Sequence, residues 1–237
     1  MISVFISGLK RRTGKSLVSA GIAGTMQGLA YDVSYYKPIQ TGAKNENGII
    51  TSQDLTLIKY VDCNIKVSST YAFQQTLSPI VSAYESSTKI DLTKLHTDFQ
   101  LNIQMRECHI VEGSNSISTP IDESHTELDL VKKLGTPLVM VINPKASTID
   151  EIISGLTYVK NSKVKCYGVI LTDYDTNSSS MEEKYLPQLI KNFTSYETLG
   201  VIPHYNDLRE LTPETLIADT LNGIELERVF NSQISKL

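Results

Sequence analysis

The most informative part of this sequence is Gly8-Leu9-Lys10-Arg11-Arg12-Thr13-Gly14-Lys15-Ser16, a loop bracketed by two glycines. It follows the apolar run 2–6 and precedes a helix-like segment, 17–23. Backbone N–H groups in such a loop, together with the positive end of the helix dipole, form a cradle for phosphate. The order of strand, loop and helix therefore predicts a nucleotide-binding site, without indicating which reaction it serves.

Within this loop, Lys15 would reach the β- and γ-phosphates and the Ser16 hydroxyl would bind Mg²⁺. Five residues separate the two glycines, one more than in the usual motif. The alternative is a chance turn before a helix, with Lys15 as a solvated residue of its first turn. Agreement between strand, loop, Gly-Lys-Ser and helix favours the phosphate site. The other residues expected around the nucleotide here are Gly8, Arg11, Arg12, Thr13, Gly14 and Leu17.

Apolar strand patterns alternate with helical patterns along the rest of the chain. Strands are predicted at 33–36, 107–113, 137–142, 164–171 and 198–203, and helices from 52 onward and at 92–105, 128–134, 149–159, 182–193 and 216–230. We expect a loop at 39–42 and a turn at 45–48. The region 67–88 is less clear: 71–73 fits a short strand or an extended loop, and 77–83 begins with a proline near a helix start. This alternation predicts an α/β fold of the P-loop NTPase type, a mostly parallel sheet with helices on both faces. Because no repeat or linker interrupts it, we expect a single domain over residues 1–237.

Composition narrows the possible partners and the compartment. The 237 residues carry a formal charge of −4, and without a basic stripe a nucleic-acid partner is not expected. No apolar run approaches the roughly 20 residues of a membrane span, so no membrane partner is expected. The cysteines at 63, 108 and 166 form no C-x-x-C pair, which favours buried thiols in a reducing cytoplasm over disulfides or zinc.

Several polar residues lie at predicted strand ends, on the edge of the sheet where ligands bind. Glu112 would be costly if buried without a partner, and beside a Mg²⁺–nucleotide it would be a metal ligand. Its alternative is an exposed carboxylate at a strand end. Lys37, held between an aromatic strand end and Pro38, could fix a carboxylate or phosphoryl group, although a surface lysine before a turn fits equally well. Thr41 could add a hydroxyl, whereas Asp54 by itself is explained as a favourable acid in a helix's first turn.

Two of these segments resemble one enzyme family. The run Lys37-Pro38-Ile39-Gln40-Thr41-Gly42 resembles the segment after the second strand of dethiobiotin synthetases, and the long 8–16 loop, with its extra residue, resembles theirs. Asp54 stands where the family keeps a Mg²⁺-binding aspartate, and Glu112-Gly113 where it keeps an acidic metal ligand and a glycine. Weaker likenesses at 77–79 and 200–203 extend the resemblance from residue 2 to about residue 205.

The resemblance implies an ATP-dependent carboxylase that makes dethiobiotin from 7,8-diaminononanoate, CO₂ and MgATP. One amine captures CO₂ as a carbamate, the γ-phosphoryl group passes to it, and the second amine closes the ureido ring. Lys15 and Lys37, with Thr41, would be the catalytic residues, and Ser16, Asp54 and Glu112 would hold Mg²⁺. Thr172 and Pro203 would lie on the nucleotide side of the site. Family members are homodimers, with the diamine close to the subunit interface.

The sequence also departs from the family pattern. Arg11 and Arg12 replace threonine and a small or acidic residue, and Ser114-Asn115-Ser116 replaces a glycine-rich pair. Ile80 stands where a histidine commonly follows Ser-Pro, and Thr172 where an asparagine reads the base. Asp173 could compensate for that asparagine or change the base preference, for example between ATP and CTP.

Two other functions stay open at this level. Lys10 lies five residues before Lys15, where deviant-loop ATPases of the partitioning and iron-carrier type keep a signature lysine. Those proteins act as dimeric switches on membranes or DNA, but Arg11 and Arg12 replace the two glycines of their loops. The second alternative is a nucleotide-binding homologue that has lost the carboxylase chemistry.

Overall fold

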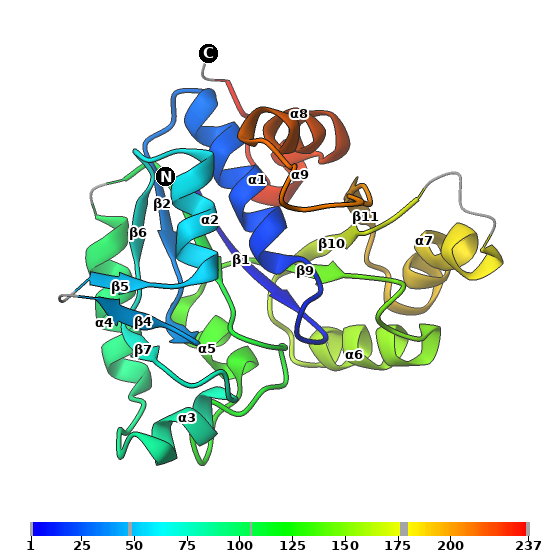
Figure 1. The fold of residues 1–237 in the computed structure, drawn as a ribbon. Helices are drawn as coiled ribbons and strands as arrows, with labels where there is room; N and C mark the ends of the chain where they lie inside the picture. Colours follow the sequence, from blue (N-terminus) through cyan, green and yellow to red (C-terminus); the bar gives the residue numbers. More distant parts are fainter. Residues whose placement is uncertain (1, 47–48, 105, 176–179, 236–237) are drawn as a thin grey trace.

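The computed structural model describes residues 2–46, 49–104, 106–175 and 180–235. Within these ranges, seven strands form one sheet in the order β11-β10-β9-β1-β8-β2-β6, and all neighbours pair in parallel (Figure 1). The strands are β1 Ile2–Gly8, β2 Val33–Tyr36, β6 Lys66–Ser68, β8 Cys108–Glu112, β9 Leu138–Ile142, β10 Cys166–Thr172 and β11 Thr198–Ile202. This arrangement confirms the predicted fold class.

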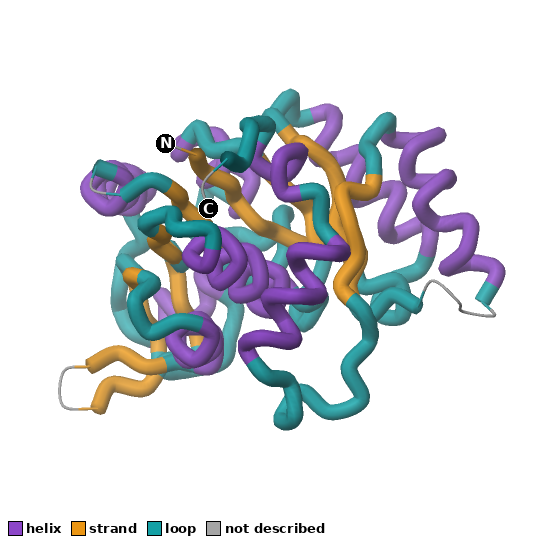
Figure 2. Tube along the Cα trace, turned by 90° about the horizontal axis from the view of Figure 1, so that it is seen from above, coloured by secondary structure: helices purple, strands orange, loops and turns teal. Residues whose placement is uncertain are grey.

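Helices cover both faces of the sheet, as the view from above shows (Figure 2). One face packs against α1 Lys15–Gly28, α2 Gln53–Val61, α8 Pro213–Gly223 and α9 Leu226–Phe230. The other packs against α3 Pro79–Glu85, α4 Leu92–Ile103, α5 Glu127–Leu134, α6 Ile149–Asn161 and α7 Met181–Thr194. No helix in the described ranges is long and apolar enough to cross a bilayer.

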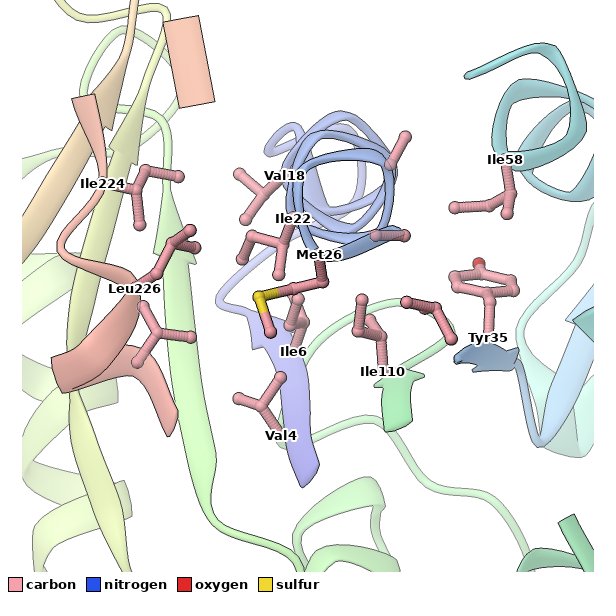
Figure 3. Close-up of a cluster of buried hydrophobic side chains, with 14 of the residues drawn as sticks. Val4, Ile6, Val18, Ile22, Met26, Tyr35, Ile58, Ile110, Ile224 and Leu226 are labelled. Carbon is pink, nitrogen blue, oxygen red and sulfur yellow. The ribbon is translucent and has the colours of Figure 1, made fainter. Parts of the chain in front are cut away.

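Successive residues of the central strands enter opposite cores, because strand side chains alternate between the two faces of a sheet. In β1, Val4 and Ile6 face α1 whereas Phe5 faces the opposite helices. Figure 3 shows the first of these cores, where Ile22 and Met26 of α1 lie above β1. This burial on both faces explains why the central strands are mostly apolar, β9 throughout, and it fixes α1 and the loop before it against the sheet.

The strand order gathers the predicted site at one edge. β8 is the neighbour of β1, with Ile6 opposite Glu112, and β2 is the next strand, with Tyr36 opposite Val111. Parallel strands all end at the same edge, so the loop after β1, Glu112 and Lys37 are neighbours there.

Short strands occur at one predicted loop and on both sides of one predicted turn. Residues 39–41, expected as a loop, form β3 Ile39–Thr41, which pairs in parallel with β7 Tyr71–Phe73. Pro38 ends β2 because it cannot donate to the ladder, and the chain then pairs anew, with the Tyr71 N–H donating to the Pro38 carbonyl at 3.1 Å. Around the turn expected at 45–48, β4 Lys44–Glu46 and β5 Ile49–Thr51 pair antiparallel; residues 47 and 48 lie outside the described ranges.

The predicted helix 216–230 is wrong as a single element, because the chain leaves the helical path between α8 and α9. Ile224 is extended and bridges to Gly200, and the Glu225 N–H donates to the Leu199 carbonyl at 2.8 Å. β11 is the edge strand of the sheet, so its free backbone groups offer this pairing. A Cβ on Gly200 would lie 2.2 Å from the Gly223 carbonyl oxygen, so the close approach requires glycine.

Candidate active site

The loop after β1 leads directly into α1, with Gly14 as the N-cap residue in a left-handed conformation (φ 83°). Among the described residues, no side chain caps the first turn of α1. Its backbone N–H groups therefore stay available for an anion, and the helix dipole adds to their attraction. This is the geometry that a phosphate site requires.

Lys15 lies along the inside of this loop and is 5% exposed. Its ammonium donates to the carbonyl oxygens of Asn115 (2.6 Å) and Lys10 (3.2 Å) rather than to a carboxylate. Burial lowers the pKa of Lys15, and the attraction of Glu127 and Glu112 only partly opposes this effect. A buried ammonium held by neutral oxygens is suited to bind an incoming anion.

A second cluster joins residues from α1, α2, the end of β8 and the residue after β2. The Ser16 hydroxyl, in the first turn of α1, donates to Asp54 Oδ1 at 2.6 Å or to Glu112 Oε1 at 2.8 Å. Lys37 Nζ lies between the same two acids, 2.5 Å from Asp54 Oδ2 and 2.9 Å from Glu112 Oε1. Asp54 comes from the first turn of α2, whose N-cap Ser52 accepts the Leu55 N–H at 3.2 Å.

Opposite charges dominate this cluster. Burial would lower the pKa of Lys37, but the charges of Glu112 and Asp54 reverse its effect and raise that pKa above its ordinary value. Burial would likewise raise the pKa of Asp54, and Lys37 lowers it instead. Lys37 is therefore charged and serves as the resident counter-ion of two acids, of which Glu112 is completely buried.

The same donor set suits a Mg²⁺ ion. Ser16, Asp54 and Glu112 present only oxygen atoms, the ligands that Mg²⁺ prefers. Glu112 Oε2 is buried without a hydrogen-bond partner among the described residues, and an orphaned carboxylate oxygen is costly unless a ligand satisfies it. In the part of the chain that the structure describes, no three His, Cys, Asp or Glu side chains are grouped so that they could hold a metal. Phosphate and water would supply the remaining ligands, as is common for Mg²⁺.

The other predicted loop residues differ in their orientation. Arg11 and Arg12 are both exposed; Arg11 donates to the Thr76 carbonyl at 3.4 Å, and Arg12 has a left-handed backbone (φ 59°). Thr13 is buried, and a Cβ on Gly8 would lie 2.5 Å from its hydroxyl oxygen. Leu17 is half-buried and packs on the α1 side of the core. The two arginines thus lie on the surface of the loop, not inside it.

Thr41 and Thr172 lie on opposite sides of the loop. Thr41 is half-buried on β3, beside Gln40, whose amide nitrogen is 2.7 Å from the Thr41 carbonyl and 3.3 Å from Asp54 Oδ2. Thr172 is buried at the end of β10, and its hydroxyl donates to the Thr13 carbonyl at 2.7 Å. Thr172 therefore supports the phosphate loop from behind.

Pro203 follows β11, next to the end of β10, where a polar cluster begins. Asp173 has a left-handed backbone (φ 56°), and its carboxylate contacts Lys145 at 3.0 Å, Asn143 at 3.3 Å and His204. This cluster and Pro203 lie on the β10–β11 side of the loop, whereas Lys37 and Glu112 lie on the β8–β2 side.

Three polar residues of the site were not predicted from the sequence. Gln40 contacts Asp54, Asn115 accepts from Lys15, and Glu127 is a completely buried acid behind the loop. Gln40 belongs to the quoted family-like run, which gives a signal for it. For Asn115 and Glu127 the sequence offers none.

Replacing Gly14 with alanine tests the tightness of the loop. A Cβ there would lie 3.0 Å from Thr172 and would force an alanine into the left-handed region. We expect a loss of about 1–3 kcal/mol of stability and weaker nucleotide binding, measured by denaturation and titration calorimetry. Gly28→Ala is the matched control, because at the end of the same helix no atom lies within 4 Å of its Cβ. Equal effects in both variants would contradict a constrained loop.

The sequence matches the model of the AAA domain family over residues 3–212. The ATP-dependent dethiobiotin synthetase BioD of Thermodesulfovibrio yellowstonii is 24% identical over 237 residues, covering 96% of this chain and 98% of that protein. The same enzyme of Bacillus subtilis is 24% identical over 236 residues and covers 98% of each chain.

Among solved structures, the septum site-determining protein MinD complexed with Mg-ADP from Pyrococcus horikoshii has a TM-score of 0.56. It is 16% identical and covers 98% of this chain and 90% of that chain. At this identity the likeness concerns the fold, and it agrees with the predicted P-loop NTPase type. The chain therefore belongs to the AAA domain family, and along nearly its whole length it resembles the ATP-dependent dethiobiotin synthetases, as its motifs predict.

Proposed function

We propose that this protein is an ATP-dependent carboxylase that forms dethiobiotin from 7,8-diaminononanoate and CO₂. The observation that carries the proposal is the joint position of Lys15, Lys37, Asp54 and Glu112 around the start of α1. Similarity to dethiobiotin synthetases over nearly the whole chain supports the same reaction. The whole chain would act as one domain, and as a homodimer.

In this proposal the two lysines have different tasks. Lys15 leaves the carbonyls of Asn115 and Lys10 and binds the β- and γ-phosphate oxygens. Lys37 is rigidly held by Asp54 and Glu112 and presents its charge to the carbamate and to the transferring phosphoryl group. Ser16, Asp54 and Glu112 would hold Mg²⁺, which neutralises charge on the phosphates when bound.

The chemistry then needs few protein groups. One amine of the diamine adds to CO₂ and loses a proton, which gives a carbamate. A carbamate oxygen attacks the γ-phosphorus, the bond to the β-phosphate oxygen breaks, and ADP leaves. The second amine attacks the carbonyl carbon of the resulting mixed anhydride and expels phosphate, which closes the ring. Positioned cations around these anions supply the electrostatic stabilisation that phosphoryl transfer requires.

The decisive experiment is an ADP-release assay with the purified protein, diaminononanoate and bicarbonate, run in parallel with ATP and CTP. We expect ADP release that requires both the diamine and bicarbonate, with dethiobiotin identified by mass spectrometry. Tight MgATP binding without product would instead indicate a homologue that has lost the chemistry. The parallel CTP series measures the base preference that Thr172 and Asp173 leave open.

The switch ATPase is the competing proposal, and Lys10 is the residue that bears on it. The Lys10 ammonium lies 2.7 Å from Glu151 on α6 and 3.1 Å from the Ala146 carbonyl of the same chain. An internal ion pair gives Lys10 a local role that needs no partner subunit. ATP hydrolysis that depends on a macromolecular partner, and not on diamine and bicarbonate, would favour the switch.

A further inference from the structure

Glu127 is a buried acid that the proposed chemistry does not use. It is the first residue of α5, where an acid is normally solvated and stabilises the helix dipole, yet it is only 1% exposed. A buried carboxylate is costly unless its oxygens accept hydrogen bonds. Its position behind the phosphate loop therefore needs a local explanation.

The hydrogen bonds of Glu127 connect the end of β1 to the segment 113–117. Oε1 accepts from the Ser7 hydroxyl at 2.5 Å, and Oε2 accepts from the Ser114 N–H at 2.7 Å. Burial raises the pKa of Glu127, and these hydrogen bonds together with the nearby Asn115 backbone oppose that effect. Ser7 is the residue immediately before the loop glycine Gly8. One carboxylate therefore binds both the start of the phosphate loop and the segment 113–117.

The segment itself lies across the end of β1. The Gly113 N–H donates to the Ile6 carbonyl at 2.9 Å, and the Ile117 N–H donates to the Gly8 carbonyl at 2.9 Å. Between these two anchors, the Asn115 carbonyl accepts from Lys15 Nζ at 2.6 Å. Glu127 thus holds the stretch of backbone that holds Lys15.

Gly113 gives a second, independent sign of this arrangement. A Cβ on Gly113 would lie 2.0 Å from Glu127 Oε1. The backbone passes so close to the carboxylate that only glycine leaves room for it. Glu127 and Gly113 therefore form a matched pair, in a chain where Ser114-Asn115-Ser116 follows instead of further glycines.

We propose that Glu127 is a positioning residue of the nucleotide site, which fixes the segment 113–117 so that the Asn115 carbonyl keeps Lys15 inside the phosphate loop before the nucleotide arrives. The inference rests on the proposed role of Lys15 in binding phosphate. Glu127 touches neither the nucleotide nor the reacting atoms in this scheme; it acts through the Ser114 N–H and the Ser7 hydroxyl.

Two substitutions at Glu127 separate its hydrogen bonds from its charge. Glu127→Gln keeps the shape, because the amide oxygen can accept from the Ser114 N–H and the NH₂ group can donate to the Ser7 hydroxyl. Glu127→Ala removes every contact. With MgATP affinity measured by titration calorimetry on the folded fraction, we expect about tenfold weaker binding for the alanine variant and less than about threefold change for glutamine.

Several outcomes would overturn the positioning role. If Glu127→Ala lowers only the folded fraction and the remaining protein binds MgATP as tightly as wild type, the residue is merely structural. If Glu127→Gln tightens binding by tenfold or more, the charge of Glu127 acts on the phosphates directly. If both variants weaken binding equally, the hydrogen-bond explanation fails.

A double-mutant cycle with Gly113 keeps the test sharp if the alanine variant is unstable. Gly113→Ala should displace Glu127 in the wild-type background and weaken MgATP binding, whereas in the Glu127→Ala background it should add less than about a twofold change. Fully additive effects would contradict the proposal.

The readout also distinguishes this inference from the proposed reaction. MgATP binding that responds to Glu127 supports the positioning role even if no dethiobiotin forms, so the reaction can fail alone. Wild-type protein that binds no triphosphate would overturn both. Dethiobiotin formation with MgATP affinity unchanged in Glu127→Ala would overturn the positioning role alone.

Discussion

Replacing Lys37 with alanine is expected to abolish turnover and also to destabilise the nucleotide-free protein by about 3–5 kcal/mol. The ammonium is 2.5 Å from Asp54 and 2.9 Å from Glu112, and the Lys37 side chain is only 5% exposed. Without it, the fully buried Glu112 and the half-buried Asp54 have no cation between them. Chemical denaturation in the absence of Mg²⁺ measures the stability loss, and ADP release measures turnover.

Mg²⁺ provides a second readout of the same variant. Two uncompensated acids form a stronger cation site, so Mg²⁺ should stabilise Lys37→Ala more than wild type. Lys94→Ala is the matched control, because its ion pair with Asp98 is exposed and such pairs contribute at most about 1 kcal/mol. Wild-type stability in Lys37→Ala, or equal stabilisation of both proteins by Mg²⁺, would refute the counter-ion role.

The parts of the site that sequence reasoning located are those whose signal is local. The loop from Gly8 to Ser16 is recognisable because its glycines, lysine and hydroxyl follow a fixed order. The apolar runs on either side of it indicate a strand and a helix. Glu112 stands out because a charge ends an otherwise buried strand. Parallel strands place Glu112 and Lys37 at the same edge of the sheet, and the strand order, with β2 next to β8, brings them together there.

What the sequence did not show depends on contacts between distant segments. Glu127 has the appearance of an ordinary first-turn acid, and only the approach of Ser7 and Ser114 makes it a buried acceptor. The break between α8 and α9 likewise arises from pairing with the edge strand β11, since the apolar pattern continues through it. Short strands such as β3 have too few residues to show a period and exist because a partner, β7, is available.

The two arginines of the loop show how a correct motif can still mislead about side chains. Five residues lie between the glycines, and among them Arg11 and Arg12 are exposed on the surface of the loop. The spacing of the motif residues predicts where the backbone lies. The direction of each side chain depends on the φ and ψ angles of its residue, and Arg12 has a left-handed backbone conformation. Anion affinity from these two residues is therefore weaker than a count of their charges suggests.

Lys15→Ala should have the opposite profile to Lys37→Ala, a large loss of ligand affinity with little loss of stability. Lys15 is buried against two carbonyl oxygens, and burial lowers its pKa. Alanine at this position removes the cost of burying a charge. This gain in stability roughly offsets the loss of the two hydrogen bonds. MgATP affinity should fall by about 100-fold or more, because the phosphates lose their buried ammonium. Titration calorimetry with MgATP, and separately with diamine, checks this split.

Lys10→Ala is the matched control for this experiment, because it removes the same charge from the same loop. The Lys10 side chain is 40% exposed and paired with Glu151, and only its backbone carbonyl contacts Lys15, a contact that alanine keeps. We expect MgATP affinity within about threefold of wild type. Equal losses in both variants would mean that the loop attracts phosphate through its net charge, whereas a loss only in Lys15→Ala would show that the buried position of one ammonium matters. The contacts of the two buried lysines favour the second result, since Lys37 is paired with two carboxylates whereas the Lys15 ammonium is held only by neutral carbonyl oxygens.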